Sequence, residues 1–439
     1  MTFVRQLFVR LLGWHLRLLA RITIWRYRPA IVGVTGNVGK TSTKLAIIAV
    51  LGVVRRVRAS PGNMNNDLGL PLAILGDWSA EELRLVSRDT PVGKKRLQKF
   101  FFWCKVIVVA KWRIIVKSKE YPEILVLEYG ADRPGDIKCL LRVARPNVSV
   151  ITAVGEYPVH VEFYGGPEGV AREKGRLIEC LPAAGFAVLN HDDKTVMDIE
   201  PRTRGKVFTY GFEKNARVRI ARFENRVEAD QPTGISFKLE CAGNSVPVRL
   251  ANVFGKAQAY ASAAAASVGL IFGMNLVKIA EALENYRSAD SRMQLLLGIK
   301  SALVIDDSYN ASPLSMHAAL DTLRDLPAKR RIAVLGDMLE IGKYTEEAHE
   351  RVGRLTAGSA DILFTVGPRA KFIAEAAEKA GMKRSVIRSF DVADEVVEPL
   401  QALLKKGDLV LVKGSHAMEL YKVVEGIKAV VMPSSSSPV

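Results

Sequence analysis

Apolar residues recur along the chain in short runs that alternate with longer amphipathic runs. In the first two thirds, the short runs that predict buried strands are 30–34, 121–128, 148–154 and 186–190. A helix-like run over 43–51 follows the first of them, and such alternation is typical of a mostly parallel sheet with helices. Residues 207–250 predict a β-rich excursion, and the alanine-rich run 255–269 predicts a closely packed helix. We therefore expect an α/β domain over residues 29–290.

A second alternation begins after residue 301. It predicts strands over 302–306, 331–335, 362–366 and 409–412, with helices over 345–355 and 370–380 and from residues 313 and 415. This pattern indicates a C-terminal, Rossmann-like parallel α/β domain over 291–432, with the boundary near residues 288–300. The serine-rich tail 433–439 is disordered by composition.

The first 28 residues carry a basic amphipathic pattern, and residues 3–28 read as one helix that Pro29 ends. At about 100° per residue, four arginines fall within about 40° of one another: Arg10, Arg17, Arg21 and Arg28. The opposite face carries Phe8, Leu12, Leu19 and Ile22. Such a helix suits either the interface of an anionic membrane or packing on its own domain. The arginines throughout the segment argue against a signal peptide.

Residues 91–119 form a second basic segment, an aromatic-rich insert within the first domain. Charges interrupt it every few residues, so it lacks the roughly 18 consecutive apolar residues of a spanning helix. Its mixture of Phe, Trp, Lys and Arg suits a lipid headgroup layer. Nucleic acid can also use such a mixture, but the long aliphatic content favours lipid or buried packing. We therefore expect no nucleic-acid partner.

The net charge of +17 is concentrated in these two segments. Residues 1–28 hold six arginines and residues 91–119 hold nine lysines or arginines, and neither segment has an acidic residue. The remainder is close to neutral, as expected of a soluble enzyme. Cys104, Cys139, Cys180 and Cys241 lie far apart in the sequence, which argues against a zinc ribbon or a disulfide framework and predicts a cytoplasmic protein.

A glycine-rich turn joins the predicted strand 30–34 to the predicted helix 43–51. It has the form G-x-x-G-K-T from Gly36 to Thr41, shorter than the strict Walker A motif because Val34 stands where that motif has its first glycine. Backbone N–H groups and the positive end of the helix dipole would meet here, which suits a polyphosphate. Lys40 would reach the β- and γ-phosphates, and Thr41 would offer its hydroxyl to Mg²⁺. The alternative is a tight turn before a surface lysine.

Other candidate residues lie near predicted strand ends. Glu128 ends the strand 121–128, at the position where nucleotide-bound Mg²⁺ is usually held. His160 and Lys174 follow the strand 148–154, although single residues of these types are most often structural. The loop 60–71 offers asparagine amides to a ligand.

Ordered motifs from about residue 30 to 430 resemble the Mur ligases, the ATP-dependent ligases that add amino acids to the peptidoglycan precursor. The motifs that carry the resemblance are residues 35–44, 62–71, 127–132, 168–175, 306–313, 334–342 and 412–415. So many motifs in the same order are very improbable by chance.

The resemblance implies a role for each matching position. ATP would be bound by Gly36, Asn37, Gly39, Lys40, Thr41 and Ser42, with Asp307 and Asn310 contacting the nucleotide. Thr41 and Glu128 would hold one Mg²⁺, and His160 and Lys174 a second, with Lys174 carbamylated by CO₂. Arg292 would reach the γ-phosphate. The substrate-binding positions would be Asn65, Asn66, Lys413 and Ser415, the last two for the amine.

The implied reaction begins with phosphorylation of a carboxylate to an acyl phosphate. An amine, D-alanyl-D-alanine or a similar amino component, then attacks, and ADP and phosphate are released. The expected catalytic residues are Lys40, His160, Lys174 and Arg292, and the acceptor would be a peptidoglycan-type precursor.

The sequence also departs from the family pattern. The family usually has a UDP-binding domain before the phosphate loop, where only about 30 residues stand here, so we expect an acceptor that is presented at the inner face of the membrane, for instance a lipid-linked one. Gln258 stands where histidine and asparagine are usual near the adenine, and His416 where arginine is common. Two other functions remain open: a membrane-associated P-loop ATPase without ligase activity, and a ligase like folylpolyglutamate synthetase.

Overall fold

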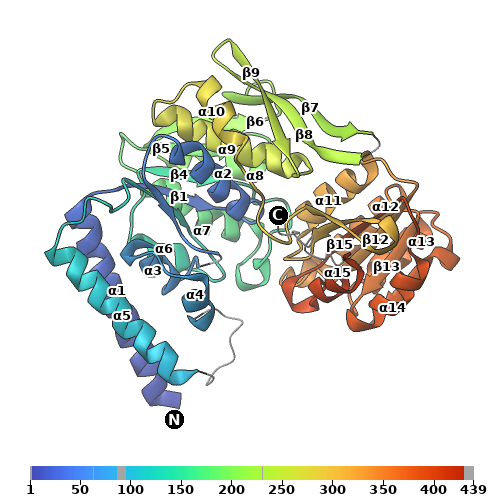
Figure 1. Ribbon diagram of the computed structural model, residues 1–439, viewed down its shortest axis with the longest axis horizontal. Coiled ribbons are helices and arrows are strands. Elements are labelled where there is room, and N and C mark those ends of the chain that lie inside the picture. The colour runs from blue at the N-terminus through green and yellow to red at the C-terminus, as the bar shows by residue number, and fades with distance from the viewer. Residues whose placement is uncertain (1, 63, 87–94, 230, 430–439) are drawn as a thin grey trace, which may run out of the picture.

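The computed structural model describes residues 2–62, 64–86, 95–229 and 231–429 of the chain. The described residues form two sheets, each with helices packed against it (Figure 1). The predicted tail 433–439, residues 91–94 of the insert and the side chain of Phe8 lie outside the described part.

The first sheet has nine strands, and the phosphate loop follows one of its inner strands. Its spatial order is β2 (Val57–Ala59), β3 (Ile124–Glu128), β1 (Ala30–Thr35), β4 (Val148–Ile151), β5 (Phe186–Asn190), β6 (Lys206–Gly211), β7 (Val218–Glu228), β8 (Gln231–Cys241) and β9 (Asn244–Ala251). Neighbours from β2 to β7 are parallel, whereas β7, β8 and β9 form an antiparallel meander. The predicted β-rich excursion is confirmed.

Alternate residues of the parallel strands pack under different helices. Val32 and Val34 of β1 belong to a core with α2 (Lys40–Gly52), α9 (Lys256–Ile271) and α10 (Leu276–Leu283). Ile31 belongs to the core on the other face, with α3 (Gly69–Leu75) and α6 (Asp136–Leu141). The helix α7 (Pro167–Glu179) packs on β1 and β4, and the short α8 (Lys194–Met197) lies beside β5. Burial on both faces explains why these strands read as continuous apolar runs.

The second sheet has six strands in the order β10 (Gln294–Leu297), β11 (Leu303–Asp307), β15 (Asp408–Lys413), β12 (Arg330–Gly336), β13 (Ile362–Val366) and β14 (Ile387–Phe390). Only β10 is antiparallel to its neighbour in this sheet. Helices α11 (Pro313–Asp325), α12 (Thr345–Ala357) and α13 (Lys371–Lys379) cover one face, and α14 (Asp394–Leu403) and α15 (Tyr421–Ile427) cover the other. The predicted C-terminal α/β sheet is thereby confirmed.

Two details of the second sheet differ from the sequence prediction. The helix expected from residue 415 begins only at Tyr421, because a single 3₁₀ turn, His416–Met418, comes first. The strand β14 was not predicted, since it is a short edge strand in which Arg388 and Ser389 are exposed. Short edge strands carry little of the apolar pattern that marks an inner strand.

The two basic segments form long helices that lie side by side (Figure 1). They are α1 (Thr2–Tyr27) and α5 (Arg96–Ile115), and both pack on α3, which packs on β3 of the first sheet. The short α4 (Ala80–Val86) packs on α5. Leu16 and Leu19 of α1 share a core with Phe102 and Val106 of α5. The Tyr27 hydroxyl donates to the Arg113 carbonyl at 2.8 Å, which ties the end of α1 to α5. No helix in the described part of the chain is long and apolar enough to cross a bilayer.

The packing decides between the two alternatives that the sequence left open for the predicted apolar face of α1. Leu12 and Leu19 were expected to face lipid or a protein core, and they are buried against the chain itself. Four exposed apolar residues of α1 lie roughly opposite, namely Leu11, Trp14, Leu18 and Trp25, whereas the exposed Val9 does not. The predicted helix and its packing are therefore confirmed, but any lipid contact would use a different face, which adjoins the arginines.

Candidate active site

The phosphate loop leaves β1 at Thr35 and enters α2 at Lys40. Gly36 (φ 146°) and Gly39 (φ 84°) have positive φ values that favour glycine, and a Cβ on Gly36 would collide with Thr152. The Lys40 Nζ donates to the Gly36 carbonyl at 2.8 Å, so this side chain folds back over the loop. Burial lowers the pKa of Lys40. Backbone amides and a lysine therefore converge at the N-terminus of α2, as phosphate binding requires.

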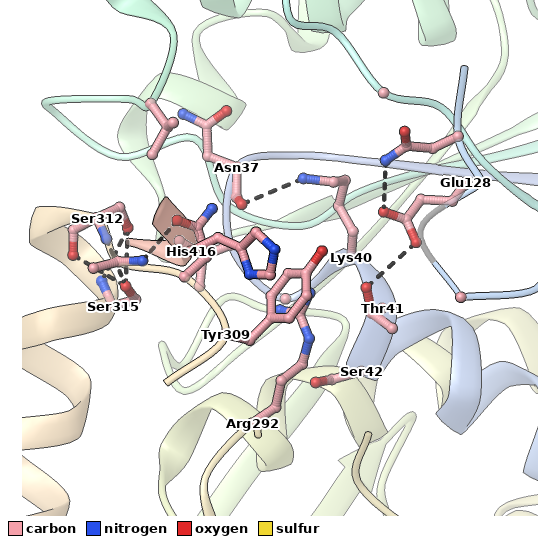
Figure 2. A pocket seen from close by; sticks show the side chains of 18 of the residues that line it. Asn37, Lys40, Thr41, Ser42, Glu128, Arg292, Tyr309, Ser312, Ser315 and His416 are labelled. Carbon is pink, nitrogen blue, oxygen red and sulfur yellow. Dashed lines mark hydrogen bonds between the residues drawn. The ribbon is translucent and has the colours of Figure 1, made fainter. Parts of the chain in front are cut away.

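Glu128 lies at the carboxyl end of β3, beside the phosphate loop (Figure 2). Its carboxylate accepts from the Thr41 hydroxyl at 3.4 Å and from the Asn65 amide at 3.2 Å. Burial alone would raise the pKa of Glu128, but the positive charges of Lys44 and Lys40 outweigh burial and lower it. Thr41 and Glu128 thus offer a hydroxyl and an ionised carboxylate, the hard oxygen donors that Mg²⁺ prefers.

Lys44 is a buried site residue to which sequence reasoning gave no role. Its Nζ lies 3.3 Å from the Glu128 carboxylate and donates to the carbonyls of Ser60 and Gly62 at 2.8 and 2.7 Å. The lysine therefore joins α2, β3 and the loop after β2. It follows Lys40 by one helical turn, and this spacing could have indicated that both amines lie on one face.

The two asparagines predicted to bind substrate hold the loop after β2 in place. The Asn65 carbonyl accepts from the Gly130 amide at 2.9 Å. The Asn66 side-chain oxygen accepts from the Leu68 and Gly69 amides at 3.2 and 2.9 Å, at the start of α3. Both residues also line the cleft described below.

His160 and Lys174, the predicted second metal site, lie on the same side of the cleft. Lys174 on α7 is 2% exposed, and burial, followed by the charge of Lys40, lowers its pKa to about 7. His160 stands between two carboxylates: its Nε2 lies 3.5 Å from Asp132, and its Nδ1 lies 2.9 Å from Glu340 without hydrogen-bond alignment. Among the described residues, no three His, Cys, Asp or Glu side chains are grouped closely enough to hold a metal alone.

The second sheet contributes the opposite wall. The Arg292 guanidinium lies 4.3 Å from the centre of the Tyr309 ring. Lys413, at the end of β15, donates to Asp307 at 2.6 Å and to the Asn310 carbonyl at 2.8 Å. Burial raises the pKa of Asp307 even though Lys413 opposes the shift. The predicted nucleotide contacts Asp307 and Asn310 therefore form one hydrogen-bonded cluster with the buried Lys413, the predicted amine contact.

Ser415 and His416 follow β15 in this wall, whereas Gln258 lies in the first turn of α9, which packs on the first sheet. The Ser415 hydroxyl accepts from the Leu339 amide at 2.9 Å, and the His416 ring centre lies 5.5 Å from that of Tyr309. The side chain of Gln258 is buried and bonded to neighbouring side chains at both its oxygen and its nitrogen. All three line the cleft.

The two walls enclose a cleft of about 870 Å³ at the carboxyl ends of β1, β3 and β15. Every site residue predicted from the sequence lines it except Gly36, which lies behind Lys40. Figure 2 shows Lys40, Thr41 and Glu128 on one side, with Arg292, Tyr309 and His416 facing them. A cleft of this kind, at the strand ends of α/β sheets, is where such folds bind nucleotides.

The cleft also has an apolar end, away from the phosphate loop. Its lining includes Leu72 of α3, Leu83 and Arg84 of α4, and Trp103 of α5. The sequence predicted lipid contact or buried packing for the insert that contains Trp103 but no ligand for Leu72, Leu83 or Arg84, because the four residues belong to three separate helices. The helices α4 and α5 therefore form part of the wall of the cleft as well as the edge of the molecule.

Comparison with known proteins assigns the fold to a family. Residues 113–269 match the Mur ligase middle domain, and residues 291–416 match the Mur ligase glutamate ligase domain. The UDP-N-acetylmuramoyl-tripeptide–D-alanyl-D-alanine ligase of Mycobacterium tuberculosis strain H37Rv is 30% identical over 421 residues, covering 91% of this chain and 73% of the relative. The chain belongs to the Mur ligase family. The expectation drawn from the sequence motifs is confirmed.

Two further relatives agree with this assignment. The corresponding ligase of Bacillus subtilis is 28% identical and covers 94% of this chain and 79% of the relative. The crystal structure of MurF ligase from Thermotoga maritima in complex with ADP has a TM-score of 0.74 and 26% identity, and covers 94% of this chain and 83% of that one. The chain is thus an ATP-dependent, ADP-forming ligase of the Mur type. The alternatives of a simple P-loop ATPase and a folylpolyglutamate-synthetase-like ligase fit less well.

Proposed function

We propose that this Mur ligase phosphorylates an acceptor carboxylate and couples the acyl phosphate to D-alanyl-D-alanine or a similar amino component. The acceptor is a peptidoglycan-type precursor. One observation supports this proposal most strongly: the phosphate loop with Lys40, the Thr41–Glu128 pair, and Arg292 with Lys413 all face one cleft, although they come from two sheets. We take residues 29–290 and 291–432 as the two domains that close on the substrates.

Charge neutralisation is the main task of the residues on the phosphate side, because phosphoryl transfer brings two anions together. Lys40 lies where it can bind the β- and γ-phosphates of ATP. Arg292, which lies just before β10 of the second sheet, would bind the transferred phosphoryl group. Thr41 and Glu128 would hold Mg²⁺, which supplies further positive charge to the phosphate oxygens.

Lys174 has the chemistry that carbamylation requires. A pKa of about 7 leaves a large fraction of its amine neutral at physiological pH, and only the neutral amine attacks CO₂. The resulting carbamate is an anionic oxygen donor, so Lys174 with His160 would provide ligands for a second Mg²⁺.

The amine-binding side is proposed around Lys413 and Ser415. Lys413 is 1% exposed and fixed between Asp307 and Asn310, so its charge is held in one position for an anionic group such as the carboxylate of a dipeptide. The Ser415 hydroxyl, which accepts a hydrogen bond from the Leu339 amide, also lies in the cleft wall. Asn65 offers its amide on the acceptor side.

We further propose that the protein is cytoplasmic and contacts the inner face of an anionic membrane through α1 and α5. The exposed side of these two helices, the outer face, carries seven apolar residues that are at least 60% exposed: Trp14 and Trp25 on α1, and Leu97, Phe101, Val108, Trp112 and Ile115 on α5. Exposed basic residues accompany them, including Arg21 and Lys111. Aromatic and aliphatic side chains beside basic ones suit the interface of an anionic bilayer.

The proposed reaction is tested with the full-length protein, ATP, D-alanyl-D-alanine, and either UDP-linked or lipid-linked acceptor. ADP release should require both acceptor and amine, and the product mass should equal their sum less one water. Lys40→Met should abolish turnover, whereas Lys371→Met, at an exposed position, should leave it unchanged. Rapid ATP hydrolysis with neither acceptor nor amine would instead favour an ATPase.

A further inference from the structure

Four consecutive aromatic residues occupy one turn of α5 and point in different directions. Phe100 and Phe101 are 55% and 67% exposed, Phe102 is buried, and Trp103 lines the cleft. The ring centres of Phe102 and Trp103 are 5.3 Å apart, and those of Phe100 and Phe101 are 5.9 Å apart. At about 100° per residue, Phe101 and Trp103 lie on nearly opposite sides of α5, and the exposed Phe100 lies between them, about 60° from Trp103. Phe100 therefore joins the outer face to the wall of the cleft.

The apolar end of the cleft serves none of the roles proposed so far. ATP would lie at the phosphate loop and the amine near Lys413, on the walls formed by the two sheets. Leu72, Leu83 and Trp103 instead line the end formed by α3, α4 and α5, together with Arg84. An apolar wall with one guanidinium suits the junction of an amphiphile, where an anionic group joins a hydrocarbon chain.

The outer face supplies the second, independent observation. Its exposed residues on α5 recur at helical spacing, as Phe101, Val108 and Ile115. They lie on the side opposite the buried Phe102 and Val106. Residues 1–28 and 95–119 contain no acidic residue, so this face is complementary to an anionic bilayer and not to a basic partner.

We infer that the acceptor is an anionic lipid-linked carboxylate, which this enzyme takes from the bilayer through the apolar end of the cleft. The hydrocarbon chain stays in the membrane beside the outer face, the anionic linkage passes Arg84 and Trp103, and the carboxylate reaches the phosphate loop. This inference rests on the proposed ligase function and adds the class of its acceptor.

The test compares one acceptor peptide in two forms: joined to a polyprenyl diphosphate in vesicles that contain anionic lipid, and joined to UDP in solution. We expect kcat/KM to be at least tenfold higher for the vesicle-bound form. Trp103→Ser should raise KM for that form about tenfold and leave KM for ATP unchanged, which also shows that the variant is folded.

A second variant carries its substitutions at exposed positions, where they should not affect folding. Val108→Ser combined with Ile115→Ser should weaken co-sedimentation with anionic vesicles about tenfold and lower turnover of the vesicle-bound acceptor in parallel. The matched control is Val277→Ser, at an exposed valine of α10, which should change neither.

The outcomes separate this inference from the proposed function. Equal kcat/KM for both acceptor forms, or Val108→Ser/Ile115→Ser turnover equal to that of the control, would overturn the inference while leaving the ligase function in place. Absence of product from both forms would overturn the ligase function itself.

Discussion

Replacement of Lys174 by methionine should stabilise the protein while abolishing its activity. The side chain is 2% exposed on α7, and methionine has a similar length without the charge. Burial lowers the pKa of Lys174 from 10.5 to about 7. Because this folded-state pKa lies below that of the unfolded chain, the lysine must lose a proton on folding between these two pH values, and folding is penalised.

The size and pH dependence of the penalty follow from the linkage of protonation to folding. Each pKa unit corresponds to about 1.4 kcal/mol, so the full penalty is about 5 kcal/mol below pH 7. Between pH 7 and 10.5 the unfolded chain binds more protons than the folded one, so the stability of the wild type rises with pH. Lys174→Met should therefore be more stable by about 4 kcal/mol at pH 7 and by about 2 kcal/mol at pH 9.

Urea unfolding of the metal-free protein in CO₂-depleted buffer, followed by circular dichroism at both pH values, measures this difference. Lys371→Met is the matched control, and its stability difference should not change between pH 7 and 9. A Lys174→Met variant that is less stable than the wild type at pH 7, or whose gain is the same at both pH values, would refute the reasoning. Ligase activity should be lost at either pH.

Three other substitutions test separate parts of the structure. Gly36→Ala should weaken ATP binding at least tenfold, because the added Cβ would collide with Thr152 and the φ of 146° at this position is unfavourable for alanine. Unchanged affinity in a nucleotide titration would contradict this prediction. Asp408→Asn should lower the free energy of unfolding by about 3 kcal/mol, because the Arg330 guanidinium loses the charged acceptor of its two hydrogen bonds (3.0 and 2.6 Å). A loss below about 1 kcal/mol would show that the pair is not stabilising. Lys44→Met should raise KM for Mg²⁺ about tenfold with little change in KM for the amine, because the loop after β2 loses two hydrogen bonds from Lys44. Equal effects on both KM values would indicate general disorder of the site.

The parts of the fold that the sequence predicted are those with strong local signals. Buried parallel strands such as β1, β3 and β12 are continuous apolar runs, and the phosphate loop has glycines at the two positions where the backbone has positive φ. The site residues were predicted near these strand ends, and nearly all of them line the cleft.

Other features depend on packing that a local pattern does not specify. The helix α1 is apolar around most of its circumference, so the pattern could not tell that Leu12 and Leu19 would be buried while Trp14 and Trp25 would be exposed. Lys44 resembled any lysine on a surface helix until the loop after β2 was placed against it. The apolar end of the cleft exists only because α3, α4 and α5 meet there.

Transfer of oxygen from the acceptor to phosphate tests the central claim most directly. The acceptor carboxylate is labelled with ¹⁸O, and the inorganic phosphate formed with ATP and D-alanyl-D-alanine is analysed by mass spectrometry. If the cleft forms an acyl phosphate, one ¹⁸O atom should appear in each phosphate released. Phosphate that carries no ¹⁸O would contradict the account, because it would mean that water, and not the carboxylate, receives the phosphoryl group.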